Sequence, residues 1–243
     1  MAPLRGKVAL VTGAARRLGR RLSLGLAEAG ASVVLHYSKS EPEASSLKAA
    51  IEASGGRAAL VRADLVQADE ARRMVRDAAR AFGRLDILIN NASLFYPTAL
   101  EPQAATSAFD ELMAVNARAP YLAALEAAAL MGDDGVIVNL TDASVLTPWP
   151  DYVAYQCSKA ALEALTRYLA RALAPRIRVN AVAPGPVLMP DGSTPADEER
   201  ALRRVPLGKL ALAEDVERAV LFLTLSSSVT GAVIPVDGGR RIG

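Results

Sequence analysis

A tyrosine and a lysine stand four residues apart in the stretch Tyr155-Gln-Cys-Ser-Lys159. On a helix, this spacing places both side chains on one face, one turn apart. An ammonium near a phenol favours the phenolate, so we expect Lys159 to pull the pKa of Tyr155 from about 10 toward neutral pH, where the phenol exchanges protons usefully. The same spacing also fits a half-buried tyrosine beside a solvated lysine, and the rest of the chain has to decide between the two.

A turn that could bind phosphate lies near the start of the chain, in Thr12-Gly-Ala-Ala-Arg-Arg-Leu-Gly19. Glycines at a strand-to-helix turn let the backbone approach a pyrophosphate, which the helix N-terminus attracts. Gly13 and Gly19 fit this pattern, whereas Arg17 stands where a middle glycine is often found. The first turns of the predicted helix contain four arginines, Arg16, Arg17, Arg20 and Arg21. These charges oppose the helix dipole unless an anion binds there, and the alternative is a solvated basic face.

The second apolar run ends in His36-Tyr-Ser-Lys-Ser40, where an NAD enzyme would place an acid on the adenosine ribose. No acid stands there. Ser38, Lys39, Ser40 and the only histidine, His36, offer hydroxyls and positive charge suited to a 2′-phosphate, which predicts NADP(H) rather than NAD(H). The alternative is an exposed loop rich in serine and lysine.

Elements that could position these residues alternate along the chain, short β-branched runs with helix-length segments. Strands are predicted at residues 8–11, 32–36, 58–62, 86–90, 136–140, 178–182 and 232–236. Amphipathic helices are predicted between them, for example over residues 68–82 and 160–173. This alternation is typical of a doubly wound parallel sheet of seven strands covered by helices on both faces, an αβα Rossmann fold. No linker or repeat divides the chain, so residues 1–243 are expected to form one domain.

Composition narrows the class of protein. The 243 residues are 51% hydrophobic and 22% charged, enough to bury a substantial core. A net charge of +2 gives no reason to expect nucleic acid or an anionic membrane as a partner, although the pI near 8.8 allows weak basic patches. No apolar run approaches the length of a membrane span or a signal peptide. The single cysteine, Cys157, excludes an internal disulfide and fits a reducing cytoplasm, and no metal site is predicted.

These motifs together resemble the short-chain dehydrogenase/reductase family, nearly end to end. Asp64-Leu65 is similar to the family's acidic position that meets adenine, Asn90-Asn-Ala-Ser93 to its Asn-Asn-Ala-Gly, and Val236-Asp-Gly-Gly239 to its closing motif. Asn116 resembles the asparagine that holds a proton-relay water, and Tyr155 and Lys159 resemble the catalytic pair. The resemblance implies the following cofactor contacts: Gly13, Arg17, Leu18, Gly19, His36, Tyr37, Ser38, Lys39, Ser40, Asp64, Leu65, Asn91, Ala92, Ser93, Tyr155, Lys159, Pro184 and Gly185.

The chain departs from the family at Asp142, thirteen residues before Tyr155, where a serine usually polarises a substrate carbonyl. An ionised carboxylate there would repel the negative charge that ketone reduction builds on oxygen. A buried, protonated carboxyl could instead donate a proton to a C=N bond, and a carboxylate could accept N–H groups from an aminopyrimidinone ring. The alternative is that Asp142 caps a turn in Thr-Asp-Ala-Ser and Ser144 takes the role of the serine.

Further residues resemble the pteridine reductase branch of the family: the 12–19 turn with His36-Tyr37, the run Asn-Asn-Ala-Ser-Leu-Phe-Tyr-Pro over residues 90–97, and Asp142. By that resemblance Arg17 contacts cofactor phosphate and substrate, Ser93 contacts the pterin, and Phe95 covers the pterin face opposite the nicotinamide. An aromatic ring suits that position because offset stacking adds about 0.5 to 1.5 kcal/mol beyond burial. Phe95 as ordinary core is the alternative.

The sequence therefore predicts an NADPH-dependent reductase of dihydropterin-type C=N bonds. Asp142 and Tyr155 supply the proton and bind substrate, Lys159 holds the ribose and keeps Tyr155 acidic, and Asn116 supports the relay. Residues 186–199 are expected to form a mobile substrate lid, and the resemblance implies a homotetramer. One alternative is a reductase of 3-oxoacyl thioesters or small ketones. Another is a non-catalytic dinucleotide-binding scaffold or sensor, which would have no chemical need for Asn116, Tyr155 and Lys159 together.

Overall fold

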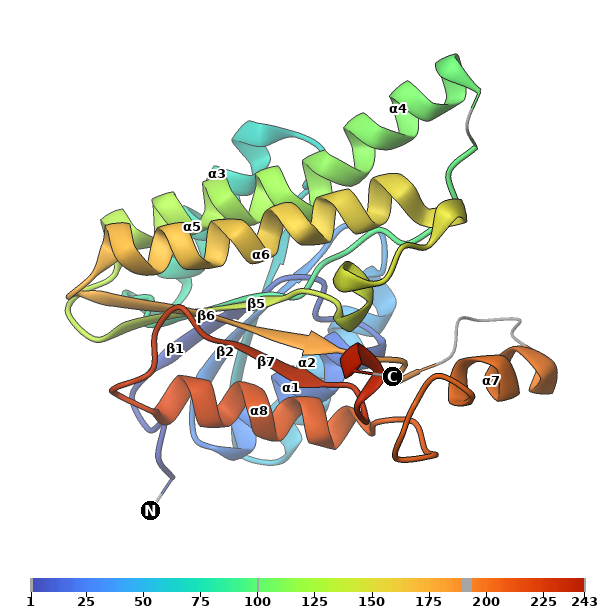
Figure 1. The fold of residues 1–243 in the computed structure, drawn as a ribbon. Helices are drawn as coiled ribbons and strands as arrows, with labels where there is room; N and C mark the ends of the chain where they lie inside the picture. The colour runs from blue at the N-terminus through green and yellow to red at the C-terminus, as the bar shows by residue number, and fades with distance from the viewer. Residues whose placement is uncertain (1, 100, 189–193, 243) are drawn as a thin grey trace.

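Seven strands form one parallel sheet in the computed structural model, which describes residues 2–99, 101–188 and 194–242 (Figure 1). The strands are β1 (Val8–Val11), β2 (Ser32–Tyr37), β3 (Arg57–Arg62), β4 (Ile87–Asn90), β5 (Gly135–Leu140), β6 (Ile177–Pro184) and β7 (Val233–Val236). Their order across the sheet is β3-β2-β1-β4-β5-β6-β7, and every neighbouring pair is parallel. The predicted fold class is confirmed.

Strand limits agree with the sequence prediction to within two residues. The largest difference is at β6, which continues past the predicted end at Val182 to Pro184. The central strands β1, β4 and β5 are buried at every position. Continuous runs of Val, Ile and Leu suit strands that are covered on both faces, which is why the apolar runs located them well.

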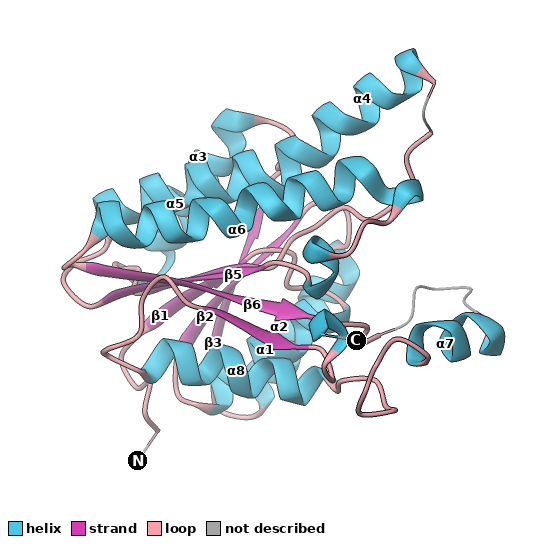
Figure 2. Cartoon of the chain, viewed as in Figure 1, coloured by secondary structure: helices cyan, strands magenta, loops and turns pink. Residues whose placement is uncertain are grey.

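Helices cover both faces of the sheet (Figure 2). The α-helices are α1 (Arg17–Glu28), α2 (Glu41–Ala53), α3 (Ala68–Phe82), α4 (Pro102–Met113), α5 (Ala119–Leu130), α6 (Val153–Leu173), α7 (Pro195–Leu202) and α8 (Ala213–Leu225). A π-helical turn η1 (Ala114–Arg118) joins α4 to α5, and short 3₁₀ turns are η2 (Ala143–Leu146), η3 (Pro150–Tyr152) and η4 (Arg240–Ile242). One apolar core packs α3, α5 and α6 on one face, through residues such as Met74 and Leu169. A second packs α1, α2 and α8 on the other, through Leu22 and Val220.

Helix α6 is longer than predicted and begins at Val153 rather than at residue 160. Pro150 opens the preceding turn η3, where its fixed φ and missing N–H are tolerated. Tyr155 and Lys159 therefore lie in the first two turns of α6, on a regular helix. Helix α3 has the predicted limits and ends at Gly83, whose φ of 76° suits a left-handed C-cap.

The expected lid, residues 186–199, is partly helical. Residues 195–202 form α7, whose N-terminus has a capping box in which Thr194 and Asp197 bond reciprocally. Residues 189–193 lie outside the described part of the chain, so the lid prediction is not tested there. Within the described ranges, no helix is long and apolar enough to cross a membrane.

The chain reverses its winding direction at β1, which pairs with β2 on one side and β4 on the other. In such a sheet, ligands bind outside the carboxyl ends of the strands at this switch point. The segments that follow β1, β4, β5 and β6 begin at Thr12, Asn91, Thr141 and Gly185. Parallel pairing brings these four segments to the same edge of the sheet.

Candidate active site

Asp142 and Tyr155 are joined by a hydrogen bond. Asp142 lies two residues beyond β5, and Tyr155 lies in the first turn of α6. The Tyr155 hydroxyl donates to Oδ2 of Asp142 at 2.6 Å, while Oδ1 accepts from the backbone N–H of Ser144 at 2.6 Å. Asp142 therefore caps the turn η2, as one alternative predicted, and also contacts Tyr155. The other part of that alternative, Ser144 in place of the family serine, has a buried Oγ with no hydrogen-bond partner among the described residues.

The pKa of Tyr155 is raised well above 10, first by burial and then by the charge and hydrogen bond of Asp142. Both effects disfavour a second anion beside the carboxylate. The expectation that Lys159 pulls this pKa toward neutral pH is therefore wrong for this arrangement. The phenol is protonated at neutral pH, as a proton donor must be.

Lys159 is buried directly behind the pair. Its Nζ donates to the backbone oxygen of Leu140 at 2.8 Å and lies 5.9 Å from the centre of the Tyr155 ring. Burial lowers the pKa of Lys159 from 10.5 to about 8, against the opposing attraction of Asp142. The ammonium is thus held at neutral pH within reach of the pair, but it titrates far earlier than a solvated lysine.

Asn116 is fully buried in the π-helical turn η1. Its Oδ1 accepts from Leu94 N at 2.8 Å, and its Nδ2 donates to Leu94 O at 2.9 Å and to Ser158 Oγ at 3.0 Å. Ser158 Oγ donates in turn to Tyr155 O at 2.6 Å. The Asn116 side chain therefore fastens the segment after β4 to the helix that carries Tyr155. Single-turn π-helices of this kind are frequent at functional sites.

Three aromatic side chains stand beside Tyr155 and are called the aromatic wall below: Phe95, Trp149 and Tyr152. The Phe95 ring stacks on Tyr152, with centres 4.7 Å apart, and meets Tyr155 edge-on at 4.8 Å. Trp149 lies 4.0 Å from Tyr152 and 5.9 Å from Phe95. Phe95 is 41% exposed, so it is not ordinary core.

Trp149 and Tyr152 were not predicted as site residues. The sequence did hold a signal, because two aromatics stand within six residues of the predicted catalytic tyrosine. What it could not show is that Phe95, from a different segment, meets them.

The turn after β1 is too tight for side chains at its two glycines. A Cβ at Gly19 would lie 2.1 Å from Gly13 O, and one at Gly13 would lie 2.9 Å from the backbone of Ala92. Arg17 has φ of 51°, in the left-handed region that favours glycine. Its guanidinium donates to Leu188 O at 2.7 Å, which connects the turn with the segment after β6. The departure from a glycine at this position therefore leaves the backbone path intact and adds a long basic side chain.

The segment after β4 is fastened to the same turn by Thr12 and Asn91. Thr12 Oγ1 accepts from the N–H groups of Asn91 and Ala92 at 2.9 and 3.0 Å. Asn91 Nδ2 donates to Thr12 O at 2.8 Å and Gly13 O at 3.1 Å. Leu18, in the first turn of α1, is half-buried. These hydrogen bonds hold the segments after β1 and β4 together at the carboxyl edge of the sheet.

His36 does not supply positive charge, contrary to the sequence prediction. It is 2% exposed, and burial lowers its pKa from 6.5 to about 4. Nδ1 accepts from Gly13 N at 3.0 Å, so Nε2 carries the proton and donates to Ala63 O at 3.1 Å. His36 is therefore a neutral brace for the glycine turn. Lys39 remains as an exposed cation after β2, flanked by half-buried Ser38 and Ser40.

The remaining predicted cofactor residues line the same edge of the sheet. Asp64 is exposed after β3 and accepts from Val66 N at 3.1 Å, whereas Leu65 and Tyr37 are buried. Ser93 is exposed after β4. Half-buried Pro184 is the last residue of β6 and precedes Gly185, where a Cβ would lie 2.8 Å from the Asp237 backbone.

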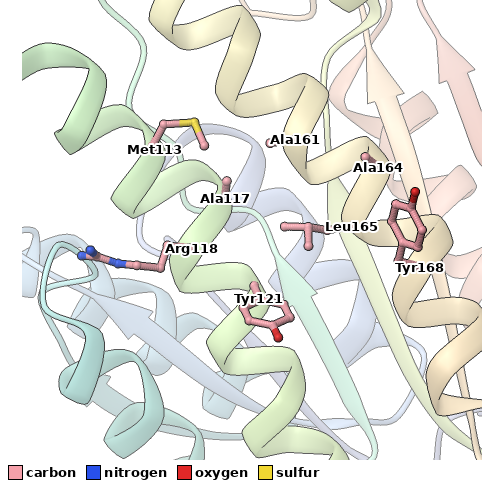
Figure 3. Close-up of a pocket in the computed structure, with 8 residues that line it drawn as sticks. All are labelled: Met113, Ala117, Arg118, Tyr121, Ala161, Ala164, Leu165 and Tyr168. Atoms are coloured by element: carbon pink, nitrogen blue, oxygen red, sulfur yellow. The ribbon is translucent and has the colours of Figure 1, made fainter. Parts of the chain in front are cut away.

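An apolar groove of about 440 Å³ lies elsewhere, between η1, the start of α5 and α6 (Figure 3). Its lining includes Met113, Ala117, Tyr121, Leu165 and Tyr168, and none of its residues belongs to the candidate site. The groove therefore shares no lining residue with the candidate site.

Comparison with known proteins agrees with the geometry. Residues 13–241 match the family described as Enoyl-(Acyl carrier protein) reductase. The chain is 37% identical to an uncharacterized oxidoreductase of Methylorubrum extorquens, with 99% of this chain and 100% of that protein covered.

Two crystal structures are close in fold and sequence. FolM alternative dihydrofolate reductase 1 from Brucella canis, complexed with NADP, gives a TM-score of 0.93 at 35% identity, over 100% of this chain and 97% of that one. The angucycline C-6 ketoreductase LanV with bound NADP gives 0.90 at 35% identity, over 99% and 98%. Both structures contain NADP, but one protein is named for dihydrofolate and the other for an angucycline ketone.

Proposed function

Because this chain belongs to the short-chain dehydrogenase/reductase family and is therefore an oxidoreductase, we propose that it uses NADPH to reduce a dihydropterin-type C=N bond. The observation that carries the proposal is the 2.6 Å hydrogen bond between Tyr155 and Asp142, with the Tyr155 ring edge-on to the exposed Phe95 ring. Together these side chains provide a proton donor, a carboxylate that can accept from ring N–H groups, and a flat apolar surface.

The residues present fit NADPH. The first turn of α1 contains no acidic residue, and its N-cap residue makes no side-chain cap, which leaves the helix N-terminus to an anion. The strand β2 is followed by Lys39 and two serines instead of an acid, a set suited to a 2′-phosphate. When bound, NADPH supplies the hydride. Arg17, Asn91 and Gly185, in the segments after β1, β4 and β6, would hold its phosphates and nicotinamide.

Tyr155 and Asp142 provide the proton. The hydroxyl proton that lies between the oxygens of Tyr155 and Asp142 would pass to the ring nitrogen as the C=N bond is reduced. Its departure would leave two anionic oxygens side by side, so a positive charge close by is needed. The buried Lys159 ammonium, with a pKa of about 8, provides that charge at neutral pH.

The aromatic wall supports a flat heterocycle as substrate. Phe95 is exposed and already stacks on one ring, that of Tyr152. A pterin could lie against the same wall while Asp142 accepts its N–H groups. Stacking of this kind adds about 0.5 to 1.5 kcal/mol per ring pair beyond burial.

The experiment is steady-state oxidation of NADPH in the presence of a dihydropterin and, separately, an acetoacetyl thioester. The proposal expects turnover with the dihydropterin and little with the thioester. NADH in place of NADPH should be the weaker reductant. Turnover of the thioester alone would contradict the proposal.

A reductase of ketones or 3-oxoacyl thioesters is the second candidate. The observation in its favour is that Asp142 also caps η2 through Ser144 N, so a purely structural role for the carboxylate has a basis. A ketoreductase among the similar structures supports the same alternative.

We also propose a homotetramer in the cytoplasm. Helices α5 and α6 carry exposed side chains that line the groove, notably Tyr121 and Tyr168. A second copy packed on this face would bury them. Light scattering of the purified chain should give about four times 25.5 kDa, and Tyr168→Glu should reduce this mass. The control is Ala49→Glu on the exposed face of α2; an unchanged mass in Tyr168→Glu would count against this face.

A further inference from the structure

Gln156, the residue after Tyr155, holds the segment of residues 144–149 through three hydrogen bonds. Its Nε2 donates to Ser144 O at 2.8 Å and to Thr147 O at 2.7 Å, and its Oε1 accepts from Trp149 N at 2.7 Å. Both amide N–H groups and one oxygen lone pair are thereby used.

The segment has few other ties of this kind. Among the described residues, its remaining hydrogen bonds stay within residues 142–152, such as Thr147 N to Ser144 O at 2.8 Å. Trp149 stands between Pro148 and Pro150, which have no N–H to donate. The Trp149 N–H is thus the donor available at this point, and Gln156 receives it.

The held segment connects two parts of the candidate site. It begins just after Asp142, the partner of Tyr155, and ends at Trp149 in the aromatic wall. Because Gln156 follows Tyr155 directly on α6, one helical turn places both the proton donor and the segment that carries Trp149. A change in the Gln156 bonds would therefore move the wall relative to Tyr155.

We infer that Gln156 is a positioning residue that sets the place of Trp149 in the aromatic wall and thereby the fit of the substrate ring. The kinetic part of this inference rests on the proposed reductase function. The structural part does not, because it concerns Trp149 in the free protein. If Gln156 only stabilised the fold, its replacement would change neither the environment of Trp149 nor the ratio of kcat to KM.

The first test uses fluorescence, since Trp149 is the only tryptophan of the chain. Gln156→Met keeps the length of the side chain and removes all three hydrogen bonds. Its Trp149 emission should shift to longer wavelength and lose anisotropy, because the indole moves away from Tyr152 and Phe95. The matched control is Gln103→Met, the same change at an exposed position of α4, which should leave the emission unchanged.

The second test is kinetic. In Gln156→Met, KM for the dihydropterin should rise about tenfold, equivalent to about 1.4 kcal/mol. The kcat should change by less than about threefold, because Tyr155, Asp142 and Lys159 keep their mutual contacts. Binding of NADPH should be unchanged.

A further variant keeps the inference testable if Gln156→Met does not fold. Gln156→Asn keeps the amide but shortens the side chain by one methylene, so the hydrogen bonds are weakened and not removed, and its emission shift and KM should lie between wild type and Gln156→Met. Wild-type emission together with wild-type KM in a folded variant would overturn the inference. So would a lower kcat with KM and emission unchanged. Absence of dihydropterin turnover in the wild type would instead refute the proposed function, and the fluorescence comparison would still decide the role of Gln156.

Discussion

The hydroxyl of Tyr155 donates to Asp142 at 2.6 Å, across thirteen residues of chain and from a helix to the end of a strand. This contact makes the carboxylate part of the proton-donating group. Burial raises the pKa of Tyr155, and the contact with Asp142 raises it further, since a phenolate would stand next to a second anion.

Asp142→Ser should separate the two candidate substrates. The change removes the carboxylate and restores a hydroxyl of the kind that carbonyl reductases use. Pterin reduction should fall about tenfold or more, whereas activity on a carbonyl substrate should stay level or rise. Steady-state rates with both substrates give the measurement. Serine is nearly as good a turn cap as aspartate, so unchanged rates with both would mean that Asp142 only caps η2.

Tyr155→Phe should lower turnover by about a hundredfold to ten thousandfold, since the ring remains and only the transferable proton is lost. Cofactor binding, measured by titration calorimetry, should persist. Tyr168→Phe is the matched control, the same change on the same helix at a side chain that is 76% exposed. If Tyr155→Phe keeps most of its activity, the proton has another source.

Arg17 should be strained by its positive φ. Arg17→Gly and Arg17→Ala both lose the guanidinium, so their difference isolates the backbone. Glycine tolerates this conformation and alanine does not, and the glycine variant should be more stable by about 1 kcal/mol. Denaturant unfolding gives the comparison, and equal stabilities would show that the backbone at residue 17 relaxes. Both variants should bind NADPH more weakly than wild type.

His36 should make the fold sensitive to acid. Its pKa is about 4 in the folded chain against 6.5 when solvated, so the unfolded state binds more protons between these values. The contribution of the neutral ring is complete above pH 6.5 and is lost as pH falls toward 4, by about 3 kcal/mol in all.

His36→Asn tests this dependence, because asparagine does not titrate. The stability difference between wild type and variant should be constant above pH 6.5 and should shift in favour of the variant between pH 6.5 and 4. Urea unfolding at several pH values measures it. A difference that does not change with pH would show that His36 is not held neutral.

Local pattern alone was enough for the strands, for helix α3 and for the pairing of Tyr155 with Lys159 on one helical face. Each depends on contacts within a few residues: continuous Val, Ile and Leu runs mark strands buried on both faces, and a spacing of four fixes neighbours on a helix. The glycine turn was predicted from the sequence for the same reason, because Gly13 and Gly19 are close together along the chain.

Tertiary structure decided the properties that depend on contacts between distant segments. His36 is neutral because the sheet buries it against Gly13 and Ala63, and the pKa of Tyr155 is raised because α6 buries its hydroxyl and places it on Asp142. Phe95 meets Tyr152 because β4 and β5 are parallel, so the segments that follow them begin at the same edge of the sheet. Burial and distance between such groups are set by packing, and a linear pattern of residue types does not contain them.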